Sequence, residues 1–167
     1  MAAPEAGQLD RTGSLPVTRM PRDPDDMTQK GCTGRVLALD YGRVHTGAAV
    51  SDPGGNIVRP LPEVRDAAGE VGIQAIRGMV AAEEAVMVVV GMPLSLSGER
   101  GAQADETQVF IDRLAQALAV PVVAWDERFT SSIAREKGKL AGAGEHSVAA
   151  CCLLEDYLGS ESYRRRR

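Results

Sequence analysis

The stretch RVLALDYGRVHTGAAVSD, residues 35–52, decides the fold. It holds two apolar runs, 36–39 and 46–50, with the turn-forming Tyr41-Gly42-Arg43 between them. Short apolar runs bounded by turn residues are typical of buried strands, so two runs this close predict a hairpin. The first run ends on Asp40. A carboxylate at the end of a central strand is costly unless it is paired or binds a metal, although an Asp that only ends the strand and caps the turn is the alternative.

Helices and strands are expected to alternate along the rest of the chain. The patterns predict strands at 56–59, 85–90 and 121–125, and helices at 71–82, 102–119, 129–139 and 145–158. Pro60 and Pro62 are expected to end the first of these strands, because proline cannot donate to a ladder. The fully apolar run 85–90 predicts an interior parallel strand. A hairpin followed by helix–strand alternation predicts an α/β fold with a mixed sheet.

The chain has 167 residues, of which 44% are hydrophobic and 25% charged, as expected for one globular domain with tails. Residues 1–34 have no apolar periodicity and predict a disordered N-terminal tail. The ordered domain is expected at 35–159, followed by a basic C-terminal tail at 160–167. We interpret the run Arg164–Arg167 as solvated, with a phosphate-seeking arm as the alternative.

Composition restricts the compartment and the partners. The sequence shows neither a membrane-length apolar run nor a secretory signal pattern, so no membrane partner is expected. The three cysteines lack metal-ligand spacing, which suits a reducing compartment, and a cytoplasmic protein is predicted. The net charge of −4 argues against a general nucleic-acid coat but not against a local site.

Two further carboxylates, Asp126 and Glu127, follow the strand predicted at 121–125 and are followed by Arg128. If this strand and the first strand are parallel neighbours, Asp40 and Glu127 emerge at the same edge of the sheet. Such a pair offers the oxygen ligands that Mg²⁺ or Mn²⁺ prefers, and two ions about 4 Å apart can activate a water to cleave a phosphodiester. Arg128 adds a guanidinium able to bind phosphate. The alternative is that Asp126-Glu127 only solvates a strand end and caps the next helix.

Four sequence segments together resemble the YqgF, or RuvX-like, family of bacterial RNase H-like proteins. They occur in order as LDYG (39–42) with GAAVSD (47–52), VGMPL (90–94) with Gly98, DERFT (126–130) and AACCLLEDYL (149–158). The resemblance implies an RNase H-like fold, with a mixed central sheet, an N-terminal antiparallel hairpin and flanking helices. It also implies a cytoplasmic, metal-dependent nuclease that matures the 5′ end of pre-16S rRNA in ribosome biogenesis, related to the RuvC-type Holliday junction resolvases.

The resemblance implies catalytic and metal-binding roles for three residues. Asp40 and Glu127 match the first two acids of the family, and His146 stands where the family has its third acid, at the start of the last helix. Imidazole is a softer ligand than carboxylate, which makes Mg²⁺ less natural than Mn²⁺ at an expected two-metal site. Arg43 and Arg128 are the expected nucleic-acid-binding residues.

The chain departs from the family at two further places. The basic pair that usually follows the first acid is Val44-His45 here, and the segment 135–145 is short and keeps only Lys137 and Lys139 of a more basic loop. Three classes of function therefore stay open. One is an RNA nuclease acting on pre-rRNA, and another is a nuclease acting on branched DNA, which would need a dimer with two sites. The last is a catalytically weakened relative that binds nucleic acid. The metal and the choice between monomer and homodimer stay open as well.

Overall fold

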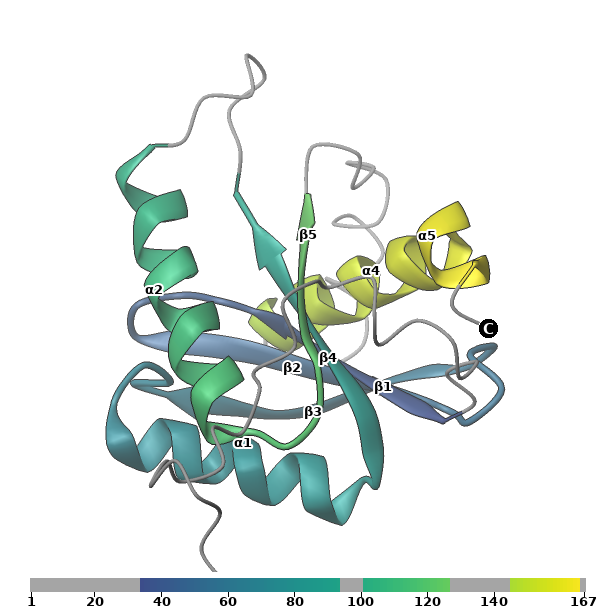
Figure 1. The fold of residues 1–167 in the computed structure, drawn as a ribbon, viewed down its shortest axis with the longest axis horizontal. Coiled ribbons are helices and arrows are strands. Elements are labelled where there is room, and N and C mark those ends of the chain that lie inside the picture. The colour runs from purple at the N-terminus through teal and green to yellow at the C-terminus, as the bar shows by residue number, and fades with distance from the viewer. Residues whose placement is uncertain (1–33, 94–100, 127–144, 166–167) are drawn as a thin grey trace, which may run out of the picture. The chain divides into compact units, whose positions relative to one another are not determined.

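The computed structural model describes residues 34–93, 101–126 and 145–165 (Figure 1). The elements follow in the order β1 (Arg35–Asp40), β2 (His45–Ser51), β3 (Val58–Arg65), α1 (Glu70–Ala82), β4 (Ala85–Met92), α2 (Ala102–Ala117), β5 (Val122–Asp126), α4 (Glu145–Gly159) and α5 (Glu161–Arg164). The predicted hairpin and the alternation after it are confirmed. The helix predicted at 129–139 lies outside the described residues.

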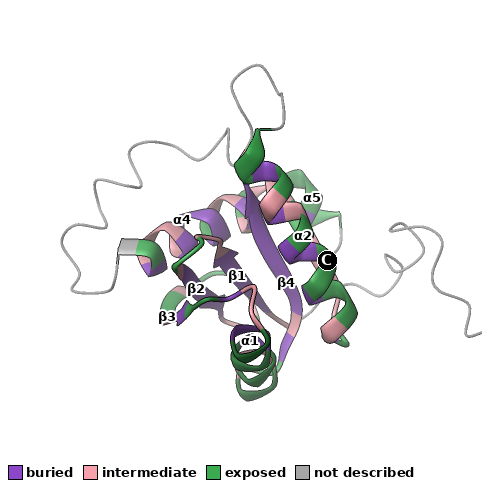
Figure 2. Ribbon diagram, turned by 90° about the vertical axis from the view of Figure 1, so that its left-hand side faces the viewer, coloured by how far each residue is buried: buried purple, intermediate pink, exposed green. Residues whose placement is uncertain are grey.

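The strands form a five-stranded sheet of order β3-β2-β1-β4-β5. β2 pairs antiparallel with both β1 and β3, whereas β4 pairs parallel with both β1 and β5. The predicted mixed sheet is therefore confirmed. β4 is the interior parallel strand expected from its apolar run, and Figure 2 shows it buried along most of its length.

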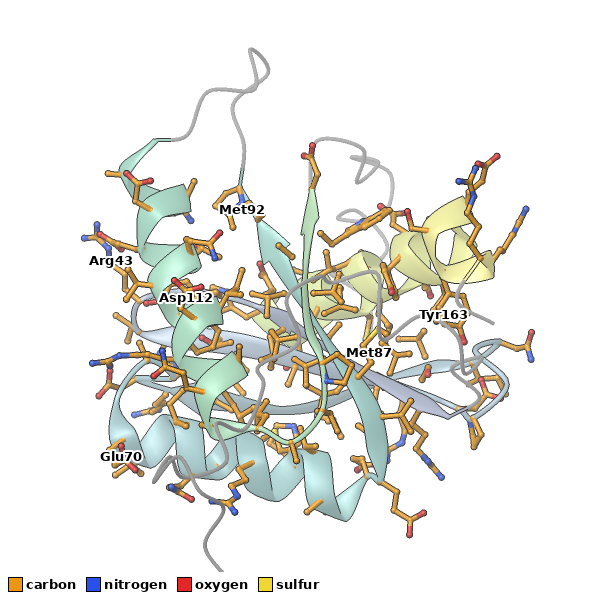
Figure 3. All side chains as sticks on the ribbon, viewed as in Figure 1. Arg43, Glu70, Met87, Met92, Asp112 and Tyr163 are labelled. Carbon is orange, nitrogen blue, oxygen red and sulfur yellow. The ribbon has the colours of Figure 1, made fainter. Side chains whose placement is uncertain are left out.

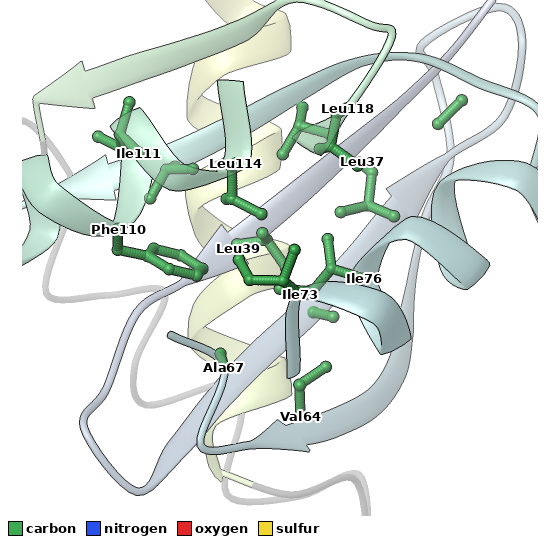
Figure 4. Close-up of a cluster of buried hydrophobic side chains, with 14 of the residues drawn as sticks. Leu37, Leu39, Val64, Ala67, Ile73, Ile76, Phe110, Ile111, Leu114 and Leu118 are labelled. Carbon is green, nitrogen blue, oxygen red and sulfur yellow. The ribbon is translucent and has the colours of Figure 1, made fainter. Parts of the chain in front are cut away.

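Helices cover both faces of the sheet, α1 and α2 on one face and α4 and α5 on the other (Figure 1). Side chains along a strand alternate between the two faces. In β1, Leu37 and Leu39 therefore pack into the α1/α2 core, which Figure 4 shows, while Val36 and Ala38 pack into the α4/α5 core. All four side chains are fully buried. β1 is therefore packed on both faces, and this packing fixes the position of its last residue.

The prediction that Pro60 and Pro62 end a strand at 56–59 is wrong. β3 runs from Val58 to Arg65 through both prolines. It is an edge strand, paired only with β2. An edge strand tolerates proline because one of its sides has no neighbouring strand to receive the missing N–H.

The C-terminal segment expected as a basic tail contains ordered structure. α5 begins after Ser160, whose side chain accepts a hydrogen bond from the backbone N–H of Tyr163. Tyr163 is only 2% exposed and belongs to the α4/α5 core. Its ring lies against Gly55, where the positive φ of +67° favours glycine and a Cβ would lie 2.7 Å from the Tyr163 hydroxyl. The basic residues Arg164 and Arg165 are exposed at the end of this helix.

Candidate active site

Asp40 is the last residue of β1 and is half-buried. It follows Val36 and Ala38 in the alternation along the strand, so its side chain lies on the α4/α5 face of the sheet. Leu39 pairs with Val90 and Gly91 pairs with Trp125. Gly91 is therefore beside Asp40 in the direction of β5, and it has no side chain to fill the space next to the carboxylate.

The two strands that precede the predicted acids are parallel but not neighbours. β4 lies between β1 and β5, and because neighbouring strands are about 4.8 Å apart, the ends of β1 and β5 are about 10 Å apart. All three strands have their carboxyl ends at the same edge of the sheet, as expected. Glu127 and Arg128 follow β5 directly in the chain and lie outside the described residues.

His146 lies in the first turn of α4, and its backbone rests directly on β2. A Cβ added to Gly47 would lie 1.9 Å from the His146 carbonyl oxygen. Gly47 is the residue that pairs with Asp40 across the hairpin. The start of α4 is therefore held above the strand pair that carries Asp40.

The imidazole of His146 stacks on that of His45. The ring centroids are 6.0 Å apart and the planes are inclined by 11°. His45 begins β2, and its Nδ1 lies 3.4 Å from a carboxylate oxygen of Glu63 on β3. His146 is exposed. The two positions predicted to depart from the family pattern, His45 and His146, are therefore neighbours in the fold.

A second contact fixes the start of α4 to the edge of the sheet. The buried hydroxyl of Ser147 donates a 2.9 Å hydrogen bond to the carbonyl oxygen of Leu61 on β3. With the contact at Gly47, this bond ties the first turn of α4 to both β2 and β3. These two contacts set the position of the His146 backbone, and neither of them involves the His146 side chain.

The side chains of Asp40 and His146 are of types that bind divalent cations. Asp40 offers hard carboxylate oxygens and His146 offers an imidazole nitrogen, both of which occur as ligands of Mn²⁺, while Mg²⁺ prefers oxygen. Within residues 34–93, 101–126 and 146–165, no three His, Cys, Asp or Glu side chains are grouped closely enough to hold a metal ion. A complete ligand set would therefore have to include a residue beyond these ranges.

Arg43, an expected nucleic-acid-binding residue, is paired with α2. Its Nε and Nη2 donate hydrogen bonds of 2.7 and 2.6 Å to the two carboxylate oxygens of Glu106. The neighbouring Tyr41 stacks on Phe110 of the same helix, with ring centroids 4.4 Å apart. Burial, and then the charge of Glu106, raise the pKa of Tyr41, so its hydroxyl stays protonated near neutral pH. Figure 3 shows Arg43 beside α2.

Two of these contacts could not be predicted from the residues alone. The pairs Arg43–Glu106 and His45–His146 join positions far apart in the sequence, and no spacing rule connects them. Gly47 did carry a signal, because a glycine inside a strand often marks a close approach of another backbone. That signal does not say which backbone approaches.

The sheet order, the helices on both faces and the acid at the end of the first strand define an RNase H-like fold. Its likeness to a solved structure supports this class. The structure "T. thermophilus RuvC in complex with Holliday junction substrate" matches with a TM-score of 0.54 and 17% identity, covering 75% of this chain and 93% of that one. The predicted fold is thus confirmed.

The family follows from the sequence match over the same region. The profile of the RuvX family, described as "Holliday junction resolvase", matches residues 34–160, and the chain belongs to this family. A relative from Chloroflexus aurantiacus is 39% identical over 130 residues, covering 74% of this chain and 85% of the relative. A relative from Thermoanaerobacter pseudethanolicus is 30% identical over 135 residues, covering 76% and 97%. Both bear the name "Putative pre-16S rRNA nuclease".

The family description and the names of the relatives are those of enzymes that hydrolyse phosphodiester bonds. The predicted class, a nuclease, is therefore confirmed. In the part of the chain that the structure describes, no helix is both long enough and apolar enough to cross a bilayer.

Proposed function

We propose that the chain is a cytoplasmic, divalent-metal-dependent nuclease that cleaves RNA and matures the 5′ end of pre-16S rRNA. The placement of Asp40 carries the proposal. This acid ends a strand buried on both faces, beside the side-chain-free Gly91 and below the first turn of α4. It lies at the edge where open α/β sheets bind their ligands. The substrate is inferred from the names of the relatives.

We assign Asp40, Glu127 and His146 as the residues that hold the metal, with two ions expected. The bound metal would supply a water activated for attack and would stabilise the leaving oxygen of the phosphodiester. Asp40 is fixed by the burial of β1 and His146 by the contacts of its backbone and of Ser147. Arg43 and Arg128 are proposed to bind substrate phosphates, since guanidinium groups pair well with phosphate oxygens.

The deciding experiment compares two substrates with the full-length protein. A precursor 16S rRNA carrying its 5′ leader and a four-way DNA junction are each incubated with Mg²⁺ and with Mn²⁺. We expect metal-dependent cleavage of the RNA and none of the junction. The family description favours the second candidate, a resolvase of branched DNA, and cleavage of the junction alone would establish it. Binding of either substrate without cleavage would indicate a catalytically weakened relative.

His146→Asp should shift the metal preference of cleavage from Mn²⁺ toward Mg²⁺. The change adds a hard oxygen ligand and a negative charge at the family's third position. His146→Ala should lower the cleavage rate by about tenfold or more, since loss of even an outer-shell partner of a metal ligand costs about that much. Rates of all variants are measured in each metal.

The matched control for this pair is His146→Phe. Phenylalanine keeps a ring that can stack on His45 but cannot bind a metal. If His146→Phe and His146→Ala both cleave as fast as the wild type, His146 is not a ligand.

Arg43→Ala should weaken binding of RNA and reduce its dependence on salt. Removal of one phosphate contact lowers the slope of log K against log salt by up to about 0.7 for a single strand. Glu106→Gln should have the opposite effect, because it removes a competing negative charge from Arg43. Binding is measured over a series of salt concentrations in EDTA, where no cleavage occurs.

Arg113→Ala is the matched control for Arg43→Ala. Arg113 is also exposed, but it lies further along α2 and donates to the carbonyl oxygen of Ala68. Removal of this charge should leave the salt slope unchanged. If both variants change the slope equally, the effect comes from the general charge of the protein and Arg43 has no specific contact.

A further inference from the structure

A hollow of about 200 Å³ lies on the α1/α2 side of the sheet edge, next to the candidate active site. It is lined by Tyr41 and Arg43 of the β1–β2 turn and by Gln103 and Glu106 of α2. A water occupies about 30 Å³ in the liquid, so the hollow has room for several waters or for one planar ring. Arg43 is the one lining residue with a role assigned above, in binding phosphate, and the hollow itself has no assigned ligand.

The ring of Tyr41 forms an aromatic wall of the hollow and is supported from behind. It stacks on Phe110, whose side chain is fully buried in the α1/α2 core. The turn that carries Tyr41 is braced by Thr46, whose hydroxyl donates to the carbonyl oxygen of Gly42. The wall is therefore an aromatic ring held in place by its neighbours, of the kind on which bases stack.

Hydrogen-bonding groups form the rim of the hollow. The forked ion pair fixes the guanidinium of Arg43 and the carboxylate of Glu106 against each other. Gln103 is exposed and carries both a donor and an acceptor. The rim therefore offers donors and acceptors beside an aromatic wall, which is the combination needed to hold a base by its face and its edge.

The position of the hollow connects it to the substrate. Tyr41 follows Asp40 directly, so their Cα atoms are about 3.8 Å apart and their side chains lie on opposite faces of the sheet. A strand whose phosphate lies at Asp40 and which passes over the sheet edge would bring a neighbouring base to Tyr41. We propose that this hollow binds an unstacked nucleobase of the single-stranded substrate next to the scissile phosphate, with Tyr41 as its stacking surface and Gln103 and Glu106 at its edge.

This inference rests on the proposed function, and a binding experiment without metal separates the two. Full-length protein in EDTA is titrated with labelled single-stranded RNA in which one abasic nucleotide is moved stepwise along the strand. We expect one position where loss of the base lowers affinity by about fivefold to 150-fold, the range for base–aromatic stacking. In Tyr41→Leu, affinity for the intact strand should fall by the same factor, and the abasic position should lose its effect.

Two further variants keep the test decisive. Tyr41→Phe retains the ring and should retain the abasic effect. Gln103→Ala changes an exposed side chain, so this variant should fold normally. It should bind the intact strand more weakly than the wild type does, with a smaller loss of affinity for the abasic strand. If Tyr41→Leu does not fold, the result with Gln103→Ala decides.

Two results would overturn the proposal: no position with an abasic effect in the wild type, or an unchanged effect in both Tyr41→Leu and Gln103→Ala. Failure to cleave RNA in Mg²⁺ or Mn²⁺, with the abasic effect present, would instead reject the proposed function and leave the base site standing.

Discussion

Asp40→Asn is expected to lower metal-dependent cleavage by at least about 100-fold while leaving the fold intact. The change replaces a charged carboxylate oxygen with a neutral amide, and hard divalent cations bind the carboxylate far better. The two side chains have nearly the same shape, and the strand beneath is buried through Val36, Leu37, Ala38 and Leu39, none of which is altered. Loss of an outer-shell partner already costs about 10-fold to 100-fold, so loss of the ligand should cost more.

The measurement is a cleavage rate in each metal, together with thermal unfolding of the same preparations. Asp105→Asn provides the matched control, because it makes the same chemical change at an exposed residue in the first turn of α2. The control should cleave at the wild-type rate. Cleavage by Asp40→Asn at the wild-type rate, with an unchanged unfolding temperature, would remove Asp40 from the catalytic site.

The order of the elements could be predicted because each depends on local patterns. The hairpin followed from two apolar runs around a turn, and β4 followed from an uninterrupted apolar run. The same local rules failed for β3, because the effect of a proline depends on whether its strand is at the edge or in the interior of the sheet. Pro60 and Pro62 would break an interior strand, but β3 is at an edge.

The relative placement of the acids shows the same limit. That Asp40 ends a buried strand can be inferred from the residues around it. The position of β4 between β1 and β5 cannot be inferred in this way, since strand order is set by how the helices pack across the whole sheet. The C-terminal segment adds a further case. Arg164 and Arg165 are exposed as expected of a solvated run, yet one aromatic residue, Tyr163, is buried in the α4/α5 core and anchors α5 there.

The site itself combines residues predicted from motifs with contacts that only the fold reveals. The motifs predict that Asp40 and His146 take the places of the family's first and third acids, and the structure holds the start of α4 above the strand pair of Asp40. His45 and His146, the two positions at which the resemblance predicts departures from the family pattern, lie side by side with their rings stacked. A change at one of these histidines should therefore be interpreted together with the other.

Gly47→Ala is expected to destabilise the protein by about 1–3 kcal/mol and to reduce cleavage sharply. The added Cβ would lie 1.9 Å from the carbonyl oxygen of His146 and 2.8 Å from the backbone nitrogen of Ser147. These are backbone atoms and cannot rotate away, so the first turn of α4 must move off the sheet. Overpacking of this kind typically costs the amount stated, and the movement would displace His146 and strain the hydrogen bond from Ser147 to Leu61.

Gly78→Ala is the matched control, since a Cβ at this position in α1 would meet no atom within 4 Å. It should stabilise the protein by about 0.5–1 kcal/mol, because alanine favours a helix interior over glycine. Denaturant unfolding gives the free energy of each variant, and cleavage rates are measured on the same samples below the unfolding transition. A folded Gly47→Ala variant that cleaves slowly would show that the seating of α4 on β2 sets the geometry of the site. Wild-type stability and wild-type cleavage in Gly47→Ala would mean that this close approach is not part of the folded protein in solution.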